Sequence, residues 1–158
     1  MNTHEYDETL YQVAAETLES LALMFLVSEE ESPQADAACP KRAAVTFTGP
    51  FSGMLVLGAS DGVLSELAGN MLGLPDMQVA TPAQQEDGLK ELTNVVCGNL
   101  LPAVAGDQPI FHISAPHVVE RQGQVSSDHL LAGAARLHAE AGTIELEFFV
   151  DERSPATV

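Results

Sequence analysis

The sequence has little positive charge, no tryptophan and only two cysteines. Its 158 residues include 23 acidic and 6 basic side chains, which gives a formal net charge of −17. Clustered Lys and Arg dominate binding to nucleic acids and anionic membranes, so we expect neither partner. Cys39 and Cys97 lie far apart and form no C-x-x-C pair. They therefore indicate neither a disulfide framework nor a zinc site.

Long apolar runs and a signal-like beginning are also missing. The longest apolar run covers residues 21–27, whereas a bilayer-spanning helix needs roughly 20 apolar residues. The first residues, MNTHEYDETL, are acidic where a signal peptide is basic and then apolar. We therefore expect a cytoplasmic protein with reduced thiols.

Length and composition predict one globular domain over residues 1–158. A chain of this size buries roughly 68–70% of its unfolded surface, and 46% of its residues are hydrophobic. We expect an acidic, proline-containing loop at 28–42 and a frayed tail at 153–158. Both segments lack the periodicity of a packed element.

Apolar residues at steps of three and four predict two helices in the first half of the chain. The first covers residues 4–27. The second covers residues 61–72, with Ser60 or Asp61 as its cap and Gly73 as its stop signal.

A third helix is predicted to begin at Thr81, where the sequence TPAQ fits a capping box with proline at the first helical position. It is expected to reach about Leu100. The ring of Pro102 would clash with the carbonyl of Gly98, so we expect the helix to end or kink there.

Alternating apolar residues predict an antiparallel sheet. One hairpin is expected around Pro50, and a three-stranded run is expected at 111–115, 135–139 and 144–150. The alanine-rich segment 131–139 is also compatible with a helix. With Ala141-Gly142 as a two-residue turn, Arg136 faces Glu147 and His138 faces Glu145. The predicted fold class is α+β, a mainly antiparallel sheet with long helices packed on it.

The third helix carries a polar stripe opposite its core face. At about 100° per residue, Asp87, Glu91, Asn94 and Gly98 fall together. An ordinary solvated face is one interpretation. However, asparagine is a poor helix former, and an interior glycine costs about 1 kcal/mol relative to alanine. Asn94 and Gly98 each lower the stability of the helix, and both lie on the stripe. This pattern favours a surface that a partner approaches closely.

The segment ELTNVVCGN at 91–99 resembles the E-x-x-N-x-x-x-G-N helix of the CheX branch of the CheC/CheX/FliY chemotaxis phosphatases. The family signature also has Asp or Ser four residues before the Glu, where Asp87 stands. It expects a proline 23 residues after the Asn, whereas Pro116 follows Asn94 by 22. The order of predicted elements agrees with such a domain over residues 4–150.

The resemblance implies a phosphatase that hydrolyses the aspartyl-phosphate of a CheY-like receiver domain. It implies that Asn94 holds the attacking water and that Glu91 pairs with a receiver lysine. Asp87 and Gly98 would contact the partner. The receiver would hold its own Mg²⁺, and this chain would bind no metal or other cofactor.

One motif rather than two favours the CheX branch, which implies a homodimer. CheC proteins carry two E-x-x-N helices. The similar segment here, Ser65 to Asn70, places its Asn four residues after Glu66 instead of three. Asn99 borders the core face, where we expect it to hydrogen-bond another element, and Cys97 is expected to be a packed small residue.

Two alternatives remain open at this point. The chain could be a CheX-like domain that binds a receiver or another signalling protein without catalysis, although such a binder would not need the Asn94 amide. It could also be an unrelated acidic interaction domain, which a buried Asn94 would favour. His112 and His117 lack a strong zinc spacing and are interpreted as surface or sheet residues.

Overall fold

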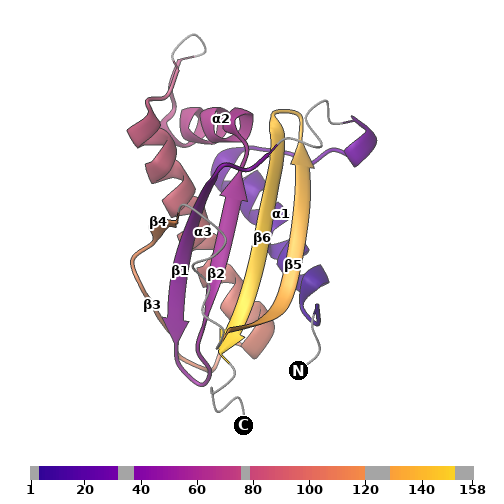
Figure 1. Cartoon of the computed structure of the whole chain (residues 1–158), viewed down its shortest axis with the longest axis vertical. Helices are drawn as coiled ribbons and strands as arrows, with labels where there is room; N and C mark the ends of the chain where they lie inside the picture. Colours follow the sequence, from indigo (N-terminus) through magenta and orange to yellow (C-terminus); the bar gives the residue numbers. More distant parts are fainter. Residues whose placement is uncertain (1–3, 32–37, 76–78, 120–128, 152–158) are drawn as a thin grey trace.

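The computed structural model describes residues 4–31, 38–75, 79–119 and 129–151. These residues form one antiparallel sheet, in the order β3-β1-β2-β6-β5 with β4 also paired to β1, and the helices lie against it (Figure 1). The elements are α1 (Asp7–Ala22), η1 (Glu29–Glu31), β1 (Lys41–Thr48), β2 (Gly53–Ala59), α2 (Asp61–Leu72), α3 (Pro82–Ala105), β3 (His112–Ile113), β4 (His117–Val119), β5 (His129–Ala139) and β6 (Gly142–Asp151). The predicted α+β class is confirmed.

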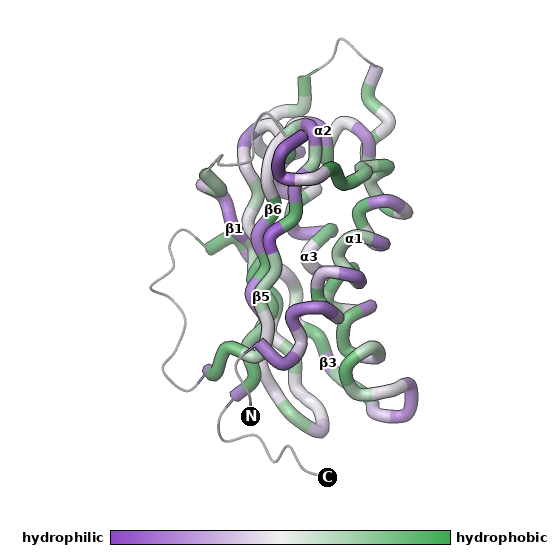
Figure 2. The backbone as a smooth tube through the Cα atoms, turned by 90° about the vertical axis from the view of Figure 1, so that its right-hand side faces the viewer, coloured by the Kyte–Doolittle hydropathy of each residue, from purple (hydrophilic) through white to green (hydrophobic). Residues whose placement is uncertain are grey.

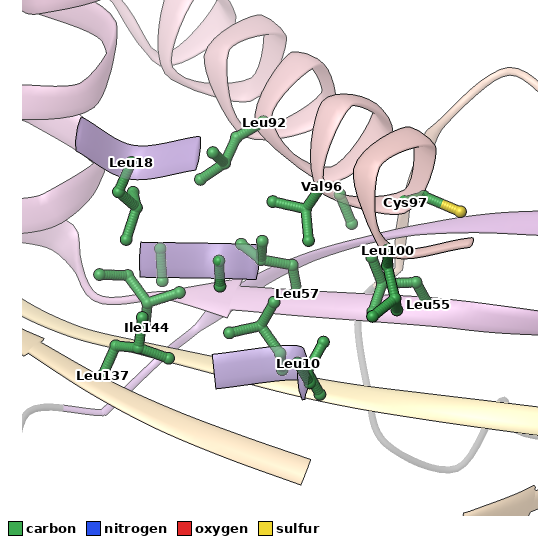
Figure 3. Close-up of a cluster of buried hydrophobic side chains, with 14 of the residues drawn as sticks. Leu10, Leu18, Leu55, Leu57, Leu92, Val96, Cys97, Leu100, Leu137 and Ile144 are labelled. Atoms are coloured by element: carbon green, nitrogen blue, oxygen red, sulfur yellow. The ribbon is translucent and has the colours of Figure 1, made fainter. Parts of the chain in front are cut away.

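The main core lies between the helices and one face of the sheet. Figure 2 shows α1 and α3 together on the same side of the strands. Leu92 and Val96 of α3 pack with Leu55 and Leu57 of β2, the centre of the sheet (Figure 3). This burial fixes the orientation of α3 and so determines which of its side chains face outward. Within the described part of the chain, no helix is both long and apolar enough to cross a bilayer.

α1 ends five residues before its predicted end, at Ala22 rather than at residue 27. Leu23 adopts a left-handed conformation with φ 54°, and its N–H donates to the Leu18 carbonyl. The chain then turns toward β5, where the Val27 N–H donates to the His138 carbonyl at 2.9 Å. The helix stops because the following residues cover the edge of the sheet.

The predicted register of the last hairpin is wrong by two residues. Arg136 faces Glu145 rather than Glu147, and His138 faces Thr143 rather than Glu145. Arg136 still forms an ion pair with the acid it faces. The long β5 strand confirms that this alanine-rich segment is not helical.

Gly142 explains the shifted register. It is already a strand residue, paired with Ala139, and residues 140–141 form the turn. A Cβ on Gly142 would lie 2.1 Å from the Ser60 Oγ. That Oγ accepts a hydrogen bond from the Thr143 N–H at 3.0 Å instead of capping α2. The glycine therefore permits close approach to the start of α2.

The predicted three-stranded run is also wrong, because β3 joins the other side of the sheet. β3 pairs with β1 at Phe47 and Thr48, and β4 pairs with β1 at 42–44. β1 begins at Lys41, inside the predicted loop at 28–42, and η1 lies there too. Residues 32–37 of that loop and the predicted tail at 153–158 lie outside the described residues.

Candidate functional site

α3, which carries the candidate site, begins at a complete capping box as predicted. The Gln84 N–H donates to the Thr81 Oγ1 at 3.1 Å, and the Thr81 N–H donates to the Gln84 Oε1 at 2.8 Å. Pro82 occupies the first helical position, where no N–H is needed. These contacts fix the start of the helix just before the polar stripe.

α3 does not end before Pro102 but continues to Ala105. The Gly106 N–H closes the helix by donating to the Pro102 carbonyl at 2.8 Å. Pro102 and Gly98 are both exposed. Since proline has no N–H, the Gly98 carbonyl lacks its usual donor four residues on. The interruption therefore falls on the polar stripe and leaves the core side intact.

The structure brings the predicted stripe together on the outer surface of α3. The core face of the helix is fully buried at Leu89, Leu92, Val96 and Leu100. On the opposite side, Asp87, Glu91 and Gly98 are exposed and Asn94 is partly exposed. The buried Asn94 that would favour an unrelated interaction domain is not seen. A partner docking here would meet a carboxylate and an amide one turn apart.

Two glycines of α3 have different surroundings. A Cβ on Gly88 would be in van der Waals contact with the Ala68 Cα at 3.5 Å, so α3 packs closely on α2 at that glycine. A Cβ on Gly98 would meet nothing within 4 Å. The fold of the described residues therefore gives no reason for Gly98, although a glycine inside a helix costs about 1 kcal/mol. At Gly98 the helix backbone is exposed and is not covered by a side chain of the described residues.

A hollow between α2 and α3 adjoins the stripe, and sequence reasoning missed it. Its volume is about 260 Å³, and its lining residues are Ala68, Met71, Leu72, Gln84, Asp87, Gly88 and Glu91. Leu72 is 52% exposed although it is apolar. The only feature of the sequence that could have indicated this hollow is the small residue Gly88, on the side of α3 that meets α2.

The charged side chains at the stripe lack partners within the described part of the chain. Asp87, Glu91 and the neighbouring Lys90 form no ion pair there, whereas the other described basic side chains do. Those pairs are Lys41 with Glu86, Arg42 with Glu145 and Glu147, and Arg136 with Glu145. The stripe thus presents two carboxylates to a partner, with the side chain of Lys90 beside them.

Neither cysteine is suited to act as a nucleophile. Burial raises the pKa of the Cys97 thiol to about 12. Burial, and then the nearby charge of Glu145, raise the pKa of Cys39 to about 11. With these raised pKa values, both thiols stay protonated at neutral pH. Only the thiolate form of cysteine is an effective nucleophile. Among the described residues, no three His, Cys, Asp or Glu side chains are grouped to hold a metal ion, and His112 and His117 are exposed.

Two asparagines outside the stripe have structural roles. The Asn99 Nδ2 donates to the Thr17 Oγ1 at 3.2 Å and joins α3 to α1, which confirms the predicted hydrogen bond. The Asn70 Nδ2 donates to the Ala22 carbonyl at 2.9 Å and fixes the end of α1. The near-motif on α2 therefore uses its asparagine inside the fold.

Comparison with known proteins identifies a family and a shared fold. The family model described as chemotaxis phosphatase CheX matches residues 42–136. CheX from Vibrio vulnificus is 19% identical, with 96% of this chain and 100% of that chain covered and a TM-score of 0.68. CheX from Desulfovibrio desulfuricans is 18% identical, with 90% and 96% covered and a TM-score of 0.66.

A third solved structure is the CheX–CheY–BeF3–Mg²⁺ complex from Borrelia burgdorferi. It is 14% identical, with 92% of this chain and 97% of that chain covered and a TM-score of 0.61. At these identities the likeness establishes the shared fold. No curated protein matches the chain significantly.

Proposed function

The chain belongs to the CheX family of chemotaxis phosphatases, and from this premise we propose that it hydrolyses the aspartyl-phosphate of a CheY-like receiver domain. The observation that carries the proposal is the outward-facing pair of Glu91 and Asn94 on α3. The solved complex of another CheX with CheY supports a receiver as the partner.

Asn94 is the residue that positions the attacking water in this proposal. Its amide both donates and accepts hydrogen bonds, so it can hold a water in line with the phosphorus without changing its own charge. The water oxygen attacks phosphorus, the bond from phosphorus to the aspartyl oxygen breaks, and the carboxylate leaves. Such a reaction depends mainly on positioning and on charge compensation.

Glu91 orients the receiver by pairing with a lysine at its phosphorylation site. It lies one turn before Asn94 on the same face and makes no ion pair within the described residues, so its carboxylate is free to do so. We expect the receiver to hold the Mg²⁺ that compensates the phosphoryl charge. This chain would supply the amide and the carboxylate alone.

We also propose that the protein acts in the cytoplasm as a homodimer, as a CheX with a single motif implies. The stripe would then occur twice per assembly, once on each α3. Sedimentation equilibrium would support this with the mass of two chains and refute it with the mass of one at micromolar concentration.

The direct test follows the decay of a phosphorylated receiver from the same organism, with and without the protein. We expect wild type to accelerate the decay about 100-fold and Asn94→Ala to lose that acceleration, which corresponds to about 2.7 kcal/mol of transition-state stabilisation. Binding without acceleration by wild type would identify the non-catalytic alternative instead.

A further inference from the structure

The hollow between α2 and α3 has an apolar floor and an acidic rim. Ala68, Met71 and Leu72 of α2 supply the apolar side chains. Asp87 and Glu91 of α3 supply two carboxylates that form no ion pair within the described residues. Both carboxylates also belong to the stripe, so the hollow and the candidate site share one continuous surface.

This lining matches a side chain with an aliphatic stem and a cationic head. Lysine and arginine place their methylene groups on apolar surface while the charged end stays near water or a carboxylate. A purely apolar occupant would bring the two carboxylates next to its own surface and desolvate them without compensation. An acidic occupant would be repelled.

We propose that the hollow is a second docking subsite for the receiver, which takes a lysine or arginine outside the phosphorylation site. The proposal rests on the proposed function. The stem lies on Met71 and Leu72, and the charged head meets Asp87, which leaves Glu91 for the phosphorylation site. Asp87 precedes Asn94 by seven residues, or about 10 Å along the helix, so one docked receiver covers both.

A cation in the subsite would also offset the repulsion between this acidic protein and an acidic receiver. A chain with a net charge of −17 repels an acidic receiver at long range, and such repulsion is screened beyond roughly 8 Å at physiological salt. A cation seated in the hollow provides attraction at contact distance. Receivers that carry a basic residue at that position would therefore be selected over those that do not.

The test compares kcat and KM for receiver dephosphorylation in two variants and one control. Leu72→Ser removes apolar surface from the floor, and Asp87→Asn removes the charge from the rim. We expect each to raise KM about tenfold, the effect of losing one good interface contact, while kcat stays within about twofold. Leu130→Ser is the control, since Leu130 is a similarly exposed leucine, 41% accessible, on β5, and its KM should not change.

The outcomes separate this proposal from the proposed function. If wild type does not accelerate dephosphorylation, the proposed function fails. If wild type is active but both variants keep the wild-type KM, the second subsite is refuted and the proposed function stands. A change in sedimentation mass for Leu72→Ser, with KM unchanged, would show that a second copy of the chain occupies the hollow, which also overturns the proposal. Thermal unfolding of each variant excludes loss of fold as the cause of a higher KM.

Discussion

Gly98 occupies the interior of α3 although an alanine there would meet no atom within 4 Å. Asn94, one turn earlier, is likewise a residue that an exposed helix surface does not favour. Both lie on the stripe with Glu91, and the described residues give neither a structural reason. At this scale the helix gives up stability where a partner is proposed to dock.

Replacement of Gly98 by alanine separates stability from docking. Because the Cβ fits freely, we expect Gly98→Ala to raise the free energy of unfolding by about 1 kcal/mol. We expect it to raise KM for the receiver, since the methyl group keeps the partner from the helix backbone. Urea denaturation and steady-state dephosphorylation measure the two effects.

Gly69→Ala is the matched control for this prediction. Gly69 lies inside α2, and a Cβ there also meets nothing within 4 Å. It should bring a similar gain in stability without a change in KM. If Gly98→Ala stabilises the protein and leaves KM at the wild-type value, close approach at Gly98 is not needed.

At the scale of elements, α3 is a helix of 24 residues with Pro102 inside it. Its proline leaves the Gly98 carbonyl without a helical donor, on the exposed side. The core side keeps its buried contacts, including Leu100 and Leu101. The helix tolerates the proline because tertiary packing holds the last turn in place.

Pro102→Ala should restore the missing hydrogen bond to the Gly98 carbonyl. We expect the free energy of unfolding to rise by about 1–3 kcal/mol, as for relief of an interior helix proline. Pro82→Ala is the control, since Pro82 is at the first helical position and blocks no helical bond. Equal changes in the two midpoints of urea unfolding would contradict this account of Pro102.

Local chemistry made part of the fold predictable. The capping box at Thr81 and the periodicity of α3 depend on neighbouring residues, and both predictions agree with the structure. The end of α1 depends on the segment that follows it, where the Val27 N–H donates to the His138 carbonyl of β5, and the last register depends on the close approach of Gly142 to Ser60. Those contacts join distant parts of the chain, so local patterns could not indicate them.

The candidate site likewise has one part that the sequence predicts and one part that it does not. One helix displays Glu91 and Asn94, so helical geometry placed them correctly on one exposed face. The hollow requires Met71 and Leu72 of α2 to lie beside Asp87. That juxtaposition follows from the packing of α2 against α3, which local sequence patterns do not predict.

At the scale of the whole molecule, we expect the excess of acidic residues to govern the encounter with the proposed receiver. The net charge of −17 acts over a Debye length of about 10 Å at 0.1 M salt. An acidic receiver is repelled before the stripe and the hollow can make contact. Association should therefore be slow at low ionic strength.

For an acidic receiver, we expect KM to fall about two- to threefold as salt rises from about 20 to 150 mM. The matched variant changes the three exposed glutamates of η1, Glu29–Glu31, to glutamine. It should have a lower KM than wild type at low salt and the same KM at high salt. A KM that rises throughout the titration would show that attraction dominates the encounter.

The central claim is that the Asn94 amide positions water against the receiver's phosphoryl group. The most direct measurement is the single-turnover rate of aspartyl-phosphate loss with the protein saturating, for wild type and Asn94→Ala side by side. The account predicts that Asn94→Ala binds the receiver with wild-type affinity but loses about 100-fold in rate, or 2.7 kcal/mol. An alanine variant that hydrolyses the phosphate as fast as wild type would contradict it.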